Sequence, residues 1–126
     1  MRTTRAIAVA ALASTTVLSS QPLAEAARYD GGWNMIAQTT RGHCGVIHIS
    51  LGVERGRIFS TGGSFAFYPI NVDGRVTKWG RARITAIAGP RVARGAGRFG
   101  ATRAEGTWQG RGPSGLCSGV WTANRF

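Results

Sequence analysis

Hydrophobic and polar residues alternate along much of this chain with the two-residue period of a β-strand. In residues 46–53, Ile47, Ile49 and Leu51 share one face, while His48 and Ser50 lie on the other. No window after residue 26 keeps the 3.6-residue apolar period of a helix. The pattern therefore predicts strands throughout this part of the chain.

Two further segments extend this pattern. Residues 81–88 alternate an alanine- and isoleucine-bearing face with a face that begins with Arg81 and Arg83. Residues 65–72 are apolar on both faces, which predicts a strand covered on both sides. Pro69 cannot donate a hydrogen bond to a ladder, so it indicates an edge or a bulge within this strand.

Turn-forming residues separate the predicted strands. All 19 glycines follow residue 26. Asp73-Gly74 is the strongest hairpin signal, Glu54 to Gly56 predicts a second hairpin, and Ser60 to Ser64 predicts a loop. Two glycine-rich strands should meet near Ala101 to Glu105, followed by a last strand from Leu116 to about Arg125. About eight short antiparallel strands predict an all-β fold, and a small barrel is preferred to a sandwich because closure removes exposed edges.

Residues 1–26 have the composition of a cleaved secretory signal peptide. Two arginines precede a short apolar stretch, and a small-x-small pattern ends at Ala26. An N-terminal membrane anchor is the alternative, but serine and threonine dilute the apolar run, which is shorter than the roughly 20 residues that a spanning helix needs. We therefore expect a single mature β domain of residues 27–126, exported and most simply periplasmic.

The chain holds two cysteines, Cys44 and Cys117. An oxidising compartment favours one disulfide between them. Closing a loop of 73 residues would stabilise the fold by roughly 4 kcal/mol. A reactive thiol or a metal pair is disfavoured, because neither cysteine has a CxxC partner or clustered histidines.

Residues 27–126 hold 14 of the 16 basic residues but 4 of the 5 acidic ones, a formal net charge of +10. GC-rich coding explains why arginine replaces lysine, but not why acids are so few. The charge therefore predicts an anionic partner. The candidate residues are arginines on predicted strand faces with two aromatic neighbours: Arg81, Arg83, Arg94, Arg98, Trp79 and Phe99. The alternative is a solvated face with no partner.

Catalytic and cofactor chemistry is poorly supplied. Only four carboxylates follow residue 26, and no pair is obviously placed across a cleft. His43 and His48 would point to opposite sides of a strand, which makes them poor co-ligands. Residues 95–100 match G-x-G-x-x-G but lack the following helix and the later acidic residue of a dinucleotide site. We expect no catalytic residue, no metal and no cofactor.

Two resemblances add to these predictions. The segments YDGGW, NVDGRV, GTWQGRG and CSGVWTANR resemble a set of small exported proteins of alphaproteobacteria, which implies export, a disulfide and a β fold but no activity. More weakly, DGGWN is similar to the first strand of calycin-type barrels, in which a basic residue of the last strand stacks on the tryptophan. That likeness implies a structural clasp of Trp33, Trp121 and Arg125. The domain is shorter than a lipocalin and lacks the later lipocalin motifs, so a ligand cavity is not implied.

The leading functional hypothesis is a non-catalytic binding module for an anionic envelope component, such as lipopolysaccharide or an acidic glycan, or for an acidic protein. Nucleic acid suits the charge but not the compartment. A secreted inhibitor of a protease or lysozyme is the alternative, and a small secreted enzyme is the third hypothesis. The sequence leaves open whether the barrel interior is filled or hollow.

Overall fold

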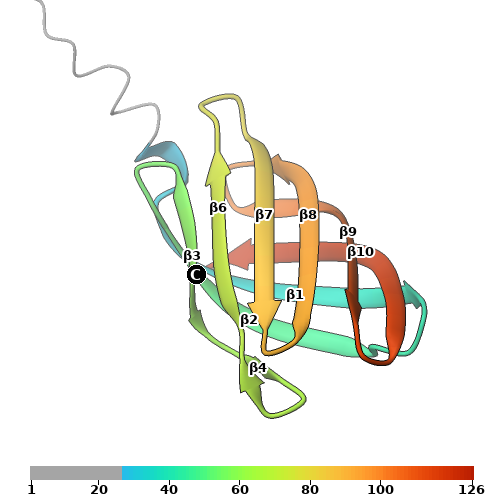
Figure 1. Cartoon of the computed structure of the whole chain (residues 1–126). Helices are drawn as coiled ribbons and strands as arrows, with labels where there is room; N and C mark the ends of the chain where they lie inside the picture. The colour runs from blue at the N-terminus through green and yellow to red at the C-terminus, as the bar shows by residue number, and fades with distance from the viewer. Residues whose placement is uncertain (1–26) are drawn as a thin grey trace, which may run out of the picture.

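Eight antiparallel strands close on themselves into one barrel (Figure 1). The structure is a computed structural model that describes residues 27–126, so the predicted signal peptide lies outside the described residues. The elements are η1 (Ala27–Tyr29), β1 (Gly31–Arg41), β2 (Val46–Glu54), β3 (Arg57–Gly62), β4 (Ser64–Phe65), β5 (Tyr68–Pro69), β6 (Asn71–Val76), β7 (Arg81–Ala88), β8 (Arg91–Phe99), β9 (Arg103–Gly112) and β10 (Gly115–Arg125). The order around the barrel is β1-β10-β9-β8-β7-β6-β3-β2, and β4 and β5 form a separate two-stranded hairpin. The prediction of an all-β barrel is confirmed.

The barrel has two different ends. Its closed end carries η1, the β2–β3 and β6–β7 connections and the C-terminus, while its open end carries the β4–β5 hairpin and the turns β7–β8 and β9–β10 (Figure 1). The predicted alternation holds in β2, where Ile49, Leu51 and Val53 are buried. It also holds in β7, where Ala82 and Ile84 are buried between exposed neighbours.

The closed end is held where the first strand meets the last. Trp33 of β1 pairs in register with Arg125 of β10, whose guanidinium carbon lies 5.5 Å from the centre of the Trp33 ring. Arg125 also donates hydrogen bonds to the carbonyl oxygens of Asp30 and Ala101. The Trp33 indole N–H donates to the carbonyl of Tyr29 at 2.9 Å. A cation held over a tryptophan face by backbone acceptors fixes the closure of the barrel.

Phe99 occupies the centre of the closed end. Its ring lies 4.8 Å from that of Trp33, 5.9 Å from that of Tyr29 and 6.2 Å from that of Trp121, and the residue is 3% exposed. The prediction that Phe99 neighbours surface arginines is therefore wrong. Successive strand residues face opposite sides, so Arg98 points outward and Phe99 inward.

Trp121 packs on a wall made of glycines. Gly97 of β8 pairs with Gly106 of β9, and a methyl group at either would lie 2.6 or 2.7 Å from the Trp121 ring. The Trp121 N–H donates to the carbonyl of Thr107 at 3.2 Å. These glycines are required by the close approach of the indole to the backbone.

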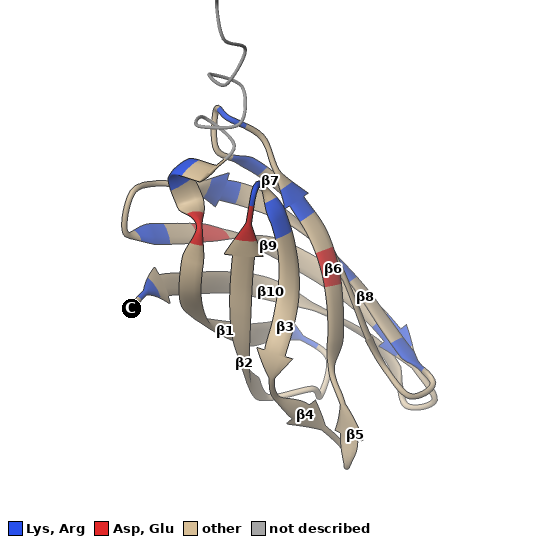
Figure 2. Ribbon diagram, turned by 90° about the vertical axis from the view of Figure 1, so that its left-hand side faces the viewer, with Lys and Arg blue, Asp and Glu red and all other residues tan. Residues whose placement is uncertain are grey.

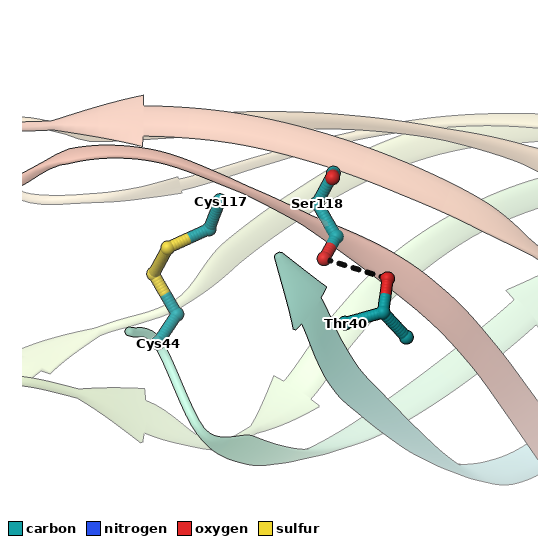
Figure 3. The surroundings of a disulfide bond; sticks show 4 residues. All are labelled: Thr40, Cys44, Cys117 and Ser118. Carbon is teal, nitrogen blue, oxygen red and sulfur yellow. Dashed lines mark hydrogen bonds between the residues drawn. A yellow bond between two sulfur atoms is a disulfide. The ribbon is translucent and has the colours of Figure 1, made fainter. Parts of the chain in front are cut away.

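The predicted disulfide joins Cys44, in the loop after β1, to Cys117 of β10, with Cα atoms 6.2 Å apart. Thr40 beside it donates a side-chain hydrogen bond to the carbonyl of Ser118 at 3.3 Å (Figure 3). The bridge therefore ties the loop at the open end to the last strand.

Several local predictions can be compared with the structure. The loop predicted at Ser60 to Ser64 is wrong, because Ser60 to Gly62 end β3 and Ser64 begins β4. Asp73-Gly74 is not a turn: it lies inside β6, where Gly74 faces Ile84 and a methyl group would lie 2.5 Å from the carbonyl oxygen of Arg83. This glycine is required by the close approach of neighbouring strands. The hairpin at Glu54 to Gly56 is confirmed, with positive φ at both Arg55 and Gly56.

Residues 65–72 do not form one strand covered on both sides. The chain instead turns at Ala66 and Phe67 in the short β4–β5 hairpin, which leaves Phe67 and Tyr68 exposed. Pro69 ends the outer strand of this hairpin, consistent with the expected edge position.

Replacing both cysteines by serine should lower the free energy of unfolding by roughly 4 kcal/mol, because the disulfide closes a loop of 73 residues in the unfolded chain. Urea unfolding of the variant and of the oxidised protein measures the difference. Reduced wild-type protein is the control and should behave like the variant. An unchanged unfolding midpoint would contradict the expected role.

Gly106→Ala should lower the free energy of unfolding by about 1–3 kcal/mol, because the methyl group meets the Trp121 ring and the carbonyl oxygen of Ala96. The matched control is Gly62→Ala in β3, where the nearest side chain is 3.7 Å away. That control should change stability by less than about 0.5 kcal/mol. Equal losses in the two variants would show that the glycine wall is not a packing requirement.

Candidate functional site

Arginine positions lie close together on β6, β7 and β8 (Figure 2), and several of these arginines are exposed on the outer wall of the barrel. Arg81 stands directly opposite Arg98 in the register, and Arg83 directly opposite Arg75. Arg94, four residues before Arg98 on β8, also faces outward. We name these five residues the arginine face. The structure thus brings all four predicted arginines onto one wall and adds Arg75.

A broad groove crosses the lower part of this wall. It has a volume of about 1030 Å³, and Arg75, Arg83 and Arg94 line it together with Arg41 of β1. The predicted Arg81 and Arg98, which stand opposite each other, both lie outside the groove, nearer the closed end. Arg41 has no signal in the sequence, since only barrel closure brings β1 round to this wall. Arg75 does have a signal in the sequence, because in a strand through residues 71–76 it faces outward. The incorrect prediction of a turn at Asp73-Gly74 concealed this signal.

Carboxylates at the border of the arginine face neutralise little of its charge. Asp73 lies in the groove, with its Oδ1 3.9 Å from Nε of Arg57, and both side chains are more than half exposed. Glu105 of β9 pairs in register with Arg98. Exposed ion pairs contribute about 0–1 kcal/mol, so the five arginines keep most of their positive potential.

Trp79 lies apart from the groove. It is 74% exposed in the β6–β7 loop at the closed end, with Nζ of Lys78 5.1 Å from its ring centre. It follows β6 by three residues and precedes Arg81 by two. Of the two predicted aromatic neighbours, Trp79 is thus on the surface near one end of the arginine face.

The histidines are separated from each other. His43 is exposed in the β1–β2 loop, and His48 is exposed on the outer side of β2, opposite Ile36. No group of three or more histidine, cysteine, aspartate or glutamate residues that could hold a metal lies within residues 27–126. Nothing in the described chain therefore supplies a ligand set for a metal.

An apolar cavity opens at the open end of the barrel, with a volume of about 110 Å³. Small inward-facing residues of β7 to β9 leave the space, among them Ala86, Ala93 and Gly110. Trp108 and Trp121 form part of its wall. The sequence left open whether the interior is filled, because the answer depends on inward residues summed over several strands. The available signal was the run of alanine and glycine at every second position of β8 and β9.

The fold and its surface define a small disulfide-bonded antiparallel β-barrel with an arginine-bearing outer wall. Comparison of the chain with protein-family models, curated proteins and solved structures finds no match. No helix of the described residues is long and apolar enough to span a membrane.

Proposed function

We propose that this chain is an exported, periplasmic, non-catalytic binding module that holds an anionic partner on the arginine face. One observation supports it above the others. Two arginine pairs, Arg81–Arg98 and Arg75–Arg83, stand directly opposite each other on neighbouring strands. Like charges in that position destabilise a sheet, so the arrangement is unfavourable for the empty fold and becomes favourable when an anion lies between the pairs.

The groove favours a ligand with several anionic groups. Arginine side chains on adjacent strands stand about 5 Å apart, and those two residues apart on one strand about 7 Å apart. Each guanidinium presents a planar fork of donors that suits carboxylate, sulfate or phosphate oxygens. A broad groove on an outer wall accepts an extended chain of such groups better than it encloses a small molecule. An acidic glycan or the phosphates of lipopolysaccharide provide that chemistry in the periplasm, and an acidic protein segment provides it through carboxylates.

The double variant Arg83→Gln, Arg94→Gln should weaken binding to a sulfated polysaccharide at least tenfold, because it removes two of the groove's guanidinium groups. The matched control, Arg28→Gln with Arg103→Gln, removes the same charge outside the groove and should change affinity by less than about threefold. Calorimetric titration measures both. Wild-type affinity should also fall steeply as sodium chloride rises from low to physiological concentration.

Equal losses in the two double variants would show that net charge alone attracts the polysaccharide. Affinity independent of salt would contradict the proposal as a whole.

Arg83→Gln should at the same time stabilise the empty protein, by about 0.2–1 kcal/mol, because it relieves the opposition to Arg75. Urea unfolding at low salt measures the gain, and high salt should diminish it by screening. Destabilisation by this exposed substitution would remove the main support for the binding role.

The alternative function, inhibition of a secreted hydrolase, has one observation in its favour. The β4–β5 hairpin stands outside the barrel, and Phe67 at its tip is 103% exposed. Ala66 and Phe67 both have positive φ, 52° and 73°, which non-glycine residues rarely adopt. Such strain accompanies functional loops. A panel of lysozymes and proteases tests this alternative: inhibition by wild type that Phe67→Ala weakens tenfold supports it, and no inhibition across the panel excludes it for those enzymes.

A further inference from the structure

The two halves of the barrel interior are filled differently. Large rings fill the closed half, where the Phe99 ring packs against those of Trp33 and Trp121. In the open half the inward positions of β7 and β8 are small, with Ala86 and Ala93 facing each other in the register. The space that remains is the cavity of about 110 Å³. An apolar cavity of about 150 Å³ holds a benzene ring, so this one has room for the end of a hydrocarbon chain.

Arg91 is the cation that reaches the entrance of this cavity from the inner side of the barrel, while Arg94 and Arg111, which also border the cavity, face outward. Arg91, the first residue of β8, lies at an inward-facing position and lines the cavity. Its stem passes over Gly112 of β9, where an added methyl group would lie 2.5 Å from Cγ of Arg91. Its guanidinium carbon lies 5.3 Å from the centre of the Phe65 ring. Within residues 27–126, Arg91 forms no salt bridge. A held cation without a carboxylate partner therefore stands beside an apolar opening.

Large apolar side chains are exposed around the same end. They come from the β4–β5 hairpin and from strand termini of the open end (Figure 1), and they are Val46, Phe67, Tyr68, Ile87 and Leu116, 44% to 103% exposed. The hairpin itself carries no charged residue (Figure 2). None of the five lines the cavity itself, so they form an apolar outer surface at the same end of the barrel, and exposed apolar patches of this kind mark ligand or partner sites.

We propose that the open end of the barrel binds a fatty acid, with the end of the acyl chain in the cavity and the carboxylate at Arg91. The charge complementarity selects the ligand: an apolar cavity alone accepts any hydrocarbon, and the cation at its entrance favours a chain that ends in an anion. This site goes beyond the proposed polyanion binding, since it uses the other end and the inner face of the strands.

Tryptophan fluorescence tests the proposal directly, because Trp108 and Trp121 line the cavity. A ten-carbon fatty acid with bromine on its terminal carbon should quench the emission of the full mature protein in a saturable way. The same acid without bromine should compete for the site. Affinity should rise about fourfold for each added methylene along a series of short chains, until the cavity is full. Absence of saturable quenching would overturn the proposal.

A matched pair of substitutions on β8 locates the chain. Ala93→Leu fills the cavity from within and should weaken the brominated acid at least tenfold. Ala96→Leu makes the same change on the outer wall of the same strand and should leave the affinity within about twofold. Near-ultraviolet circular dichroism verifies that both variants keep the aromatic core. Equal affinities in the two folded variants would place the acid elsewhere and overturn the assignment.

The head group is tested by comparing a fatty acid with the alcohol of the same chain length. Arg91→Gln should weaken the acid about tenfold and leave the alcohol unchanged, because only the carboxylate gains from the guanidinium. Arg103→Gln, at the closed end, should affect neither. A loss of the same size for acid and alcohol would assign Arg91 to packing and overturn its role toward the carboxylate. Ala93→Leu should keep the wild-type affinity for the sulfated polysaccharide, because it keeps every arginine. Its loss of fatty-acid binding alone would therefore separate this proposal from that of polyanion binding.

Discussion

The pairing of the first strand with the last is the constraint on which this barrel depends. Every other neighbouring pair in the barrel except β3–β6 is consecutive in sequence, whereas β1 and β10 come from opposite ends of the domain. Two stabilising devices lie along this one seam. Arg125 stacks on Trp33 at the closed end, and the Cys44–Cys117 disulfide ties the open end. The chain thus fixes the seam that would otherwise leave two unpaired edges.

Closure also decides what the interior can hold. A barrel of eight strands encloses a space that side chains just fill, so the size of the inward residues determines whether each level is packed or hollow. At the closed end three aromatic rings meet over glycines, and Gly97 and Gly106 are needed because the Trp121 ring takes their space. At the open end alanine and glycine of β7 to β9 leave space that the neighbouring rings of Trp108 and Trp121 border but do not fill, and this space is the cavity.

The sequence predicts most of the fold, because strand alternation and turn chemistry are local properties. Alternation in residues 46–53 and 81–88 assigns the inward faces, and the compartment rule pairs the cysteines. The surface position predicted for Phe99 was wrong although alternation excludes it, since Phe99 follows Arg98 on a strand and the two residues face opposite sides. The hairpin predicted at Asp73-Gly74 was wrong because the dipeptide Asp-Gly occurs in a strand here. Gly74 is required by the close approach of the neighbouring strand and not by a turn, and the sequence does not distinguish the two cases.

The candidate sites were less predictable, because each depends on residues from several strands. The outward position of the four predicted arginines follows from the alternation of strand faces. Arg41, in contrast, lies in the groove only because the barrel closes and brings β1 to this wall. Opposition of Arg75 to Arg83 depends on the register, which a single strand does not contain. The cavity likewise depends on small inward-facing residues that lie at the same height in β7, β8 and β9, and the sequence of one strand does not show which residues of the next strands lie beside it.

The same alternation separates the two proposed sites. Ala93 faces the cavity and Arg94 faces the groove, although they are consecutive on β8. The two faces of one strand therefore border an apolar interior and a cationic exterior. A substitution of Ala93 is expected to change the cavity, and a substitution of Arg94 is expected to change the groove. Most of the arginines belong to the outward set, whereas Arg91 at the cavity entrance does not. A count of arginines therefore does not distinguish the two surfaces, and the signal of the cavity lies in the small residues between them.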